Sequence, residues 1–201
     1  MATKKIVWYE GAIYHITNRG NHRNDIFRDE EDFQVYLTFI EENLIYFSSS
    51  NYKLITYCLM DNHVHLMIQA NLEPLGKFMG RLNSRYTRWF NKKYNYIGHL
   101  FQDKYFSELI EQTNQLLDTS RYIHLNPVKA KMVDYPEEYK WSSYKVFIGK
   151  NKSKLIDENI VLRQFKYNNR FELYKTFVEY KLILLKEEME REDRNKETNV
   201  I

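Results

Sequence analysis

Cysteine is almost absent from this chain of 201 residues, since Cys58 stands alone. A single cysteine excludes a disulfide within the chain and suits a reducing compartment. The first residues lead into no apolar signal segment, and no apolar run is long enough to span a bilayer. We therefore expect a cytosolic protein with no membrane partner.

Internal repeats are also lacking, and the composition is that of a globular protein. Hydrophobic residues make up 43% of the chain, which is enough for a sizeable core. With 17 tyrosines present, any single tyrosine is more often a packing residue than a catalytic one. The net charge of +3 hints at an anionic partner but does not establish one.

The pattern of apolar residues predicts an α+β fold. Short alternating or apolar runs predict strands at residues 9–17, 52–60, 63–68 and 101–110. Helical spacing predicts a helix after Asp29, which can cap it, a long helix over residues 75–94, and a third helix capped by Thr113. The order of strands and helices predicts a ferredoxin-like (RRM-like) antiparallel sheet with helices on one face.

The chain after this sheet forms a separate segment in our prediction. Residues 149–154 are polar and small, which suits a boundary, so we divide the chain into 1–149 and a C-terminal helical extension over 150–201. Helical patterns cover residues 157–165 and 171–190. The last residues are rich in charged side chains and Asn, a composition that is compatible with disorder.

Two histidines at the start of the third predicted strand form a candidate metal site. Asp61 and Asn62 predict a turn, and His63 and His65 then share one face because side chains alternate along a strand. Neutral imidazole suits divalent transition metals. An isolated His-x-His is more often a pair of half-buried structural histidines, so a second stretch must complete the site.

Tyr122 and Asn126 supply that second stretch. Helical spacing places them on one face, one turn apart, where the phenol is a candidate nucleophile and the amide oxygen a candidate third metal ligand. Asn126 precedes Pro127, so it is equally suited to end its helix or to cap a following one. Tyr122 is equally suited to packing in the core. His124 must face another direction, and His15 has no assignment.

Several cations are candidates for binding nucleic acid. The loop after the first strand carries Arg19 and Arg23, and Lys104 and Arg121 flank the later part of the predicted domain. A basic stripe on the helix at 75–94 suits either solvent or a phosphate backbone. Its members are Lys77, Arg81, Arg85 and Arg88.

These segments together resemble a known family. His63-Val64-His65 on a strand and RYIHLNPVKA at residues 121–130 resemble the single-tyrosine HUH transposases, where HUH denotes two histidines around a bulky hydrophobic residue. YHITNRG at residues 14–20 and GHLFQ at 98–102 are similar to segments of the REP-associated tyrosine transposases, which are relatives of the transposases of small single-strand insertion sequences. The resemblance covers about residues 14–144.

The resemblance implies an enzyme of DNA transposition and recombination whose catalytic domain is residues 1–149. It implies Tyr122 as the nucleophile, and Mg²⁺ or Mn²⁺ held by His63, His65 and Asn126. Single-stranded or hairpin DNA would be nicked through a 5′-phosphotyrosine intermediate, and the strand then transferred without ATP. The family also implies a homodimer.

Two other functions remain alternatives. One is a non-catalytic nucleic-acid-binding module of ferredoxin-like fold, although the aromatic-rich platform motif typical of RNA-recognition domains is absent. The other is a metal-dependent hydrolase that uses water in place of a covalent tyrosine.

Overall fold

A four-stranded antiparallel sheet forms the centre of the protein. The computed structural model describes residues 7–198. The strands are β1 (Ala12–Arg19), β2 (Lys53–Met60), β3 (His63–Ala70) and β4 (Phe106–Ile110), arranged in the order β2-β3-β1-β4. Every neighbouring pair is antiparallel. This order confirms the predicted ferredoxin-like sheet.

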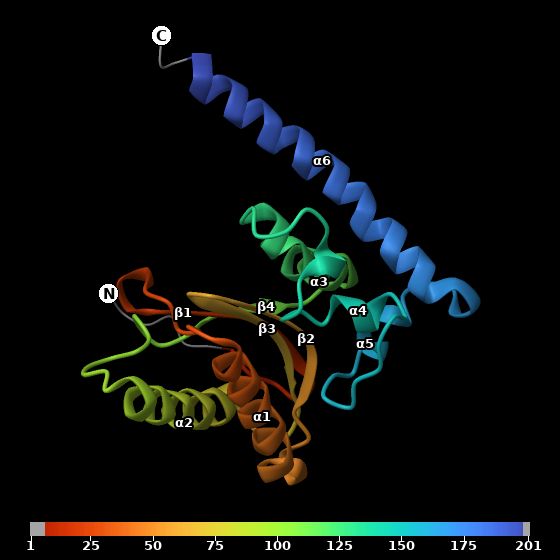
Figure 1. Ribbon diagram of the computed structural model, residues 1–201. Helices are drawn as coiled ribbons and strands as arrows, with labels where there is room; N and C mark the ends of the chain where they lie inside the picture. The colour runs from red at the N-terminus through yellow and green to blue at the C-terminus, as the bar shows by residue number, and fades with distance from the viewer. Residues whose placement is uncertain (1–6, 199–201) are drawn as a thin grey trace.

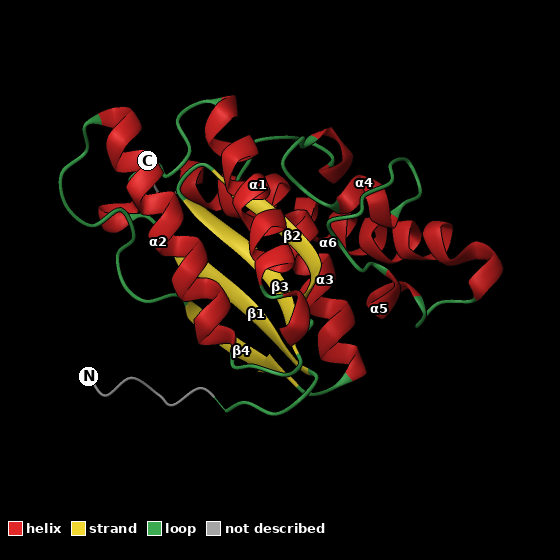
Figure 2. Ribbon diagram, turned by 90° about the horizontal axis from the view of Figure 1, so that it is seen from below, coloured by secondary structure: helices red, strands yellow, loops and turns green. Residues whose placement is uncertain are grey.

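Helices cover both faces of the sheet, so the prediction of helices on one face was wrong. Helices α1 (Glu30–Tyr46) and α2 (Leu75–Tyr94) lie against one face, and α3 (Thr113–Lys129) lies against the other (Figures 1 and 2). The physical reason is that both faces are apolar. Leu66 and Ile68 are fully buried on the side of α1 and α2, while Cys58 and Met67 are fully buried on the side of α3.

Helix and strand ends follow local chemistry with some corrections. Asp29 caps α1 as predicted, in a reciprocal capping box with Asp32. Thr113 does not cap α3, because the preceding residue, Gln112, occupies that position and makes no side-chain cap bond. Strand β4 starts at Phe106 instead of residue 101, because Phe101 makes only an isolated bridge with Gly20.

The C-terminal part is helical. It contains α4 (Tyr144–Phe147), α5 (Asn159–Leu162) and α6 (Arg170–Thr198), with 3-10 turns at Pro136–Glu138 and Tyr167–Asn169. Two further 3-10 turns lie earlier in the chain, at Asn21–Arg23 and Ser48–Ser50. Helix α6 is longer than the expected 171–190; it passes α3 and then extends away from the body (Figure 1). The division at residue 149 stays a prediction. None of the described helices is long and apolar enough to cross a membrane.

Gly20 ends β1 beside the turn into β3, and its lack of a side chain is required there. Its N–H donates to the Asn62 carbonyl at 2.9 Å, and a Cβ would lie 2.1 Å from the Asn24 carbonyl oxygen. Gly80, inside α2, has space for a side chain, because a Cβ there would have no atom within 4 Å.

We predict that Gly20→Ala destabilises the protein by roughly 1–3 kcal/mol, because backbone must move to admit the methyl group. Gly80→Ala should stabilise it by about 0.5–1 kcal/mol through helix propensity. Urea unfolding followed by circular dichroism measures both. Equal midpoints for the two variants would contradict the close approach at Gly20.

Candidate active site

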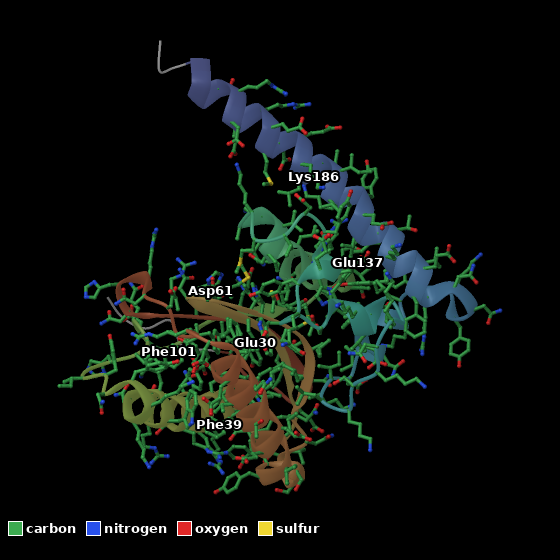
Figure 3. The ribbon with its side chains drawn as sticks, viewed as in Figure 1. Glu30, Phe39, Asp61, Phe101, Glu137 and Lys186 are labelled. Atoms are coloured by element: carbon green, nitrogen blue, oxygen red, sulfur yellow. The ribbon has the colours of Figure 1, made fainter. Side chains whose placement is uncertain are left out.

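Strand β3 presents His63 and His65 on the face of the sheet that α3 covers. The pairing of β1 with β3 places Arg19 opposite His63 and Thr17 opposite His65. The two imidazole rings are 4.9 Å apart between centroids and nearly perpendicular. Asp61, labelled in Figure 3, marks the turn that leads into His63. His63 and His65 therefore lie on the same face of the sheet, as the sequence predicts.

Both histidines have their Nδ1 atoms engaged. His63 Nδ1 lies 2.7 Å from Asn62 Oδ1, and an amide oxygen only accepts hydrogen bonds, so Nδ1 donates. His65 Nδ1 lies 3.0 Å from His15 Nε2 and 3.2 Å from Thr17 Oγ1. When this Nδ1 also carries the proton, both histidines keep a free Nε2. A free, neutral nitrogen is what a metal ligand requires.

Burial keeps both rings neutral at physiological pH. Burial, with the nearby charge of Arg19, lowers the pKa of His63 to about 4. Burial also holds the pKa of His65 well below its usual value, and the neighbouring His63, His15 and Arg19 act in the same direction. His15 has a lowered pKa because it is buried, although Glu108 opposes the shift.

Tyr122 projects from α3 onto these rings. Its ring meets His65 edge-on at 5.5 Å between centroids and His15 at 5.8 Å. The side chain is 43% exposed, and its hydroxyl has no hydrogen-bond partner among residues 7–198. A tyrosine that packs in the core would be buried, as Tyr14, Tyr86 and Tyr174 are. Tyr122 is thus free to meet a substrate.

Asn126 lies one turn further along α3 and bonds to Tyr122. Its Nδ2 donates to the Tyr122 carbonyl at 2.8 Å, which leaves Oδ1 as the unused atom of the amide. The helix continues through Pro127 to Lys129, so Asn126 neither ends its helix nor caps another one. Those two alternatives were wrong, because the helical hydrogen bonding goes on past Asn126, whose carbonyl accepts from the Ala130 N–H at 2.9 Å.

The available donors fit a divalent metal. No group of three or more His, Cys, Asp or Glu side chains within the described residues could hold a metal. A site built on His63 and His65 therefore needs another kind of ligand, and the Asn126 amide oxygen is one of the hard donors that Mg²⁺ and Mn²⁺ accept. Water can complete such a coordination sphere. No thiolate competes, because Cys58 is fully buried.

Two hollows meet at Tyr122. One, of about 440 Å³, lies between β1, β4 and α3; its lining residues are His15, Thr17, Phe106, Glu108, Asp118, Thr119 and Tyr122. The other, of about 370 Å³, lies between α3 and α6 and includes Tyr122, Asn126, Lys181, Leu185 and Glu188. The C-terminal helix α6 therefore contributes side chains to the surroundings of the tyrosine.

The predicted DNA-binding cations do not gather at one place. Arg85 stacks on Phe39 of α1, labelled in Figure 3, and pairs with Glu42. Helix α1 covers the face of the sheet opposite to α3, which carries Tyr122 (Figure 1). On the same helix α2, Lys77 pairs with Glu73 and Arg81 lies over the Tyr46 ring, while Arg88 lies one turn beyond Arg85.

The cations near the site are fewer. Arg121 pairs with Asp118 at 2.7 Å and lies over the Phe177 ring. Arg19, Arg23 and Lys104 are exposed and form no ion pair with any described residue. Arg19 is on the face of the sheet that carries the histidines, because it pairs with His63. These three stay available for an anionic partner.

The sequence prediction did not assign His15, Thr17 or Asn62 to the site. His15 and Thr17 alternate along β1, and strand alternation places them on one face, but the register with β3 is needed to bring them to His65. Asn62 was predicted only as a turn residue. Its position directly before the first histidine was the available signal.

Comparison with known proteins identifies the family. The family model described as "Transposase IS200 like" matches residues 9–126, more than half of the 201 residues, and the match includes both histidines, Tyr122 and Asn126. The chain belongs to the IS200-like transposase family. No curated protein matches this chain.

One solved structure supports the fold of this transposase family member. It is similar to the structure of a REP-associated tyrosine transposase bound to a REP hairpin, with a TM-score of 0.64 and 12% identity over 78% of this chain and 98% of that one. A transposase structure from Deinococcus radiodurans R1 is 17% identical over 60% of this chain and 95% of that one, at a TM-score of 0.40.

We predict that His15 orients His65 for metal binding. His15→Ala should weaken Mn²⁺ binding by about tenfold, because hydrogen-bond partners of metal ligands typically contribute 10–100-fold. His65→Ala should weaken it much further. Titration followed by electron paramagnetic resonance measures free Mn²⁺ directly and needs no catalytic activity.

His99→Ala is the matched control, since His99 is exposed and makes no contact with His65. If His15→Ala binds Mn²⁺ as tightly as His99→Ala does, His15 has no orienting role.

Proposed function

We propose that this IS200-like transposase is a nickase and strand transferase that acts on single-stranded DNA through Tyr122. The observation that carries the proposal is the contact of the exposed Tyr122 ring with the ring of His65. A hydroxyl nucleophile beside two neutral imidazoles suits metal-assisted phosphoryl transfer, because the imidazoles can hold the cation next to the attacking oxygen.

The chemistry uses this chain's own groups. Tyr122 attacks the scissile phosphorus, the bond from phosphorus to the 3′-oxygen breaks, and a 5′-phosphotyrosine and a 3′-hydroxyl result. A divalent cation bound by His63, His65 and Asn126 would polarise the phosphate and offset its charge. A later attack by a 3′-hydroxyl on the phosphotyrosine forms a new strand and releases Tyr122. The bond energy is conserved, so no ATP is needed.

The proposed substrate is single-stranded DNA with a hairpin. Support comes from the similar structure, which is bound to a REP hairpin, and from the free cations Arg19, Arg23 and Lys104. Phosphate contacts of this kind give affinity that falls as salt rises. A non-catalytic DNA-binding module would bind the same DNA and form no covalent product.

We predict that the wild-type protein forms a denaturation-resistant adduct with labelled hairpin-containing single-stranded DNA in Mn²⁺, and that Tyr122→Phe forms none. The variant should fold normally, because the Tyr122 hydroxyl has no hydrogen bond to lose within the described chain. A chelator, His63→Ala or His65→Ala should also abolish the adduct while leaving DNA binding largely intact.

The matched control is Tyr180→Phe, an exposed tyrosine on α6. Tyr86 is a poorer control, because its hydroxyl donates to the Ile26 carbonyl and its loss would cost about 1 kcal/mol of stability. Peptide mapping then locates the DNA. An adduct on a peptide without Tyr122, or an active Tyr122→Phe protein, would refute the assignment of the nucleophile.

We further propose that two copies form a homodimer, as the family resemblance implies. Edge strand β4 has one neighbour in the sheet, which leaves its outer side available for pairing. The outer side of β2 is already used, because Leu59 and Tyr57 share backbone hydrogen bonds with Trp141 and Ser143. Light scattering at high protein concentration should give twice the mass of one chain. A monomer with full activity would remove this proposal.

A further inference from the structure

The half of the sheet that α3 leaves uncovered forms a hollow against the nucleophile. Strand β4 places Phe106 beside Thr17 and Glu108 beside His15, all facing the same side as Tyr122. The hollow measures about 440 Å³, which is within the range of pockets that hold small organic ligands. Because Tyr122 is one of the lining residues, a group bound in the hollow would lie next to the proposed nucleophile.

Phe106 is the apolar surface of this hollow. It is 65% exposed, whereas Phe78, Phe90 and Phe147 are fully buried. An exposed aromatic ring on an open sheet face is a platform on which a nucleobase can stack, and such stacking is tolerant of sequence.

Glu108 is the polar group that can read the stacked base. None of the lining residues is a lysine or an arginine, so a phosphate group would meet only the carboxylates Glu108 and Asp118. Asp118 is already paired with Arg121 at 2.7 Å, whereas Glu108 forms no ion pair with a described residue. A carboxylate accepts hydrogen bonds from exocyclic amino groups such as cytosine N4.

Two exposed cations stand two residues away from the lining of the hollow along the chain. Arg19 follows Thr17 by two residues along β1, Lys104 precedes Phe106 by two residues, and the Gln102 N–H donates to the Arg19 carbonyl, which holds the two segments together. Both cations are exposed. A single strand can therefore place its phosphates at Arg19 and Lys104 and turn a base inward to Phe106.

We propose that this hollow is a nucleobase subsite, in which Phe106 stacks on an unpaired base next to the scissile phosphate and Glu108 selects bases that carry an amino group. The proposal rests on the proposed function, because it takes single-stranded DNA as the substrate. Thymine is disfavoured, since it has no amino group and its one ring donor, N3–H, lies between two carbonyl oxygens that a carboxylate repels.

Short fluorescent oligo-dC and oligo-dT, bound to the wild-type chain and followed by anisotropy, test the subsite. We expect oligo-dC to bind about tenfold more tightly than oligo-dT, the size of one good base contact. Glu108→Gln should bring the ratio close to one, because an amide offers both a donor and an acceptor. Phe106→Ala should weaken both by roughly fivefold or more and keep the ratio.

Glu111→Gln is the matched control, since Glu111 is exposed directly after β4 and does not line the hollow. Circular dichroism checks the fold of each variant. An unchanged ratio in Glu108→Gln overturns the proposal, as does unchanged affinity in Phe106→Ala. A wild-type dimer that becomes a monomer in Phe106→Ala also overturns it, because Phe106 then belongs to an interface between copies.

The two proposals fail independently. Oligonucleotide binding does not need the Tyr122 hydroxyl, so the ratio can be measured in Tyr122→Phe. If the protein shows the base preference but forms no adduct, the subsite proposal stands and the proposed chemistry is refuted. If it forms the adduct without the base preference, the proposed chemistry stands and the subsite proposal is refuted.

Discussion

The buried imidazole of His124 determines which way α3 faces. Its Nε2 lies 2.8 Å from Thr56 Oγ1 of β2 and 2.8 Å from Ser143 Oγ, and its Nδ1 lies 2.8 Å from the Tyr174 hydroxyl of α6. Burial lowers the pKa of His124 to about 3, so the ring is neutral and each nitrogen has one role. Leaving such a buried group without its partner costs about 1–3 kcal/mol. Because His124 is two residues from Tyr122, anchoring it inward turns Tyr122 outward, onto His65.

The pairing of β1 with β3 provides the other half of the site. A slip of one residue in this pairing would move every side chain of β1 to the opposite face of the sheet. His15 and Thr17 would then no longer contact His65. Buried Tyr14 and Ile16 on the other face oppose such a slip, since they would be exposed. Core packing on one side of the sheet therefore fixes the polar contacts on the other side.

Periodicity was enough to predict most of the fold and to group the two residue pairs of the proposed site, His63 with His65 and Tyr122 with Asn126. The helix at residues 75–94 and the turn at Asp61 and Asn62 follow from local pattern alone. The packing of α3 on the second face of the sheet was missed, because alternation along a strand does not show that both of its faces are buried. Met67 is buried on that second face. His15 and Asn62 were missed for a related reason. Their roles depend on which atoms they meet across strands or within a turn, and spacing along the chain carries little of that information.

Helix α6 packs against α3, although the amino-acid composition predicts a domain boundary between them at residue 149. Residues 149–154 suit a linker, yet the Tyr174 hydroxyl beyond them completes the His124 network and also donates to Ser120 of α3 at 3.1 Å. Lys181, Leu185 and Glu188 then line the hollow beside Tyr122 and Asn126. Helix α3, which carries Tyr122, is thus held between the sheet and α6. A C-terminal extension in this position bears on the orientation of Tyr122, even though none of its side chains belongs to the proposed chemistry.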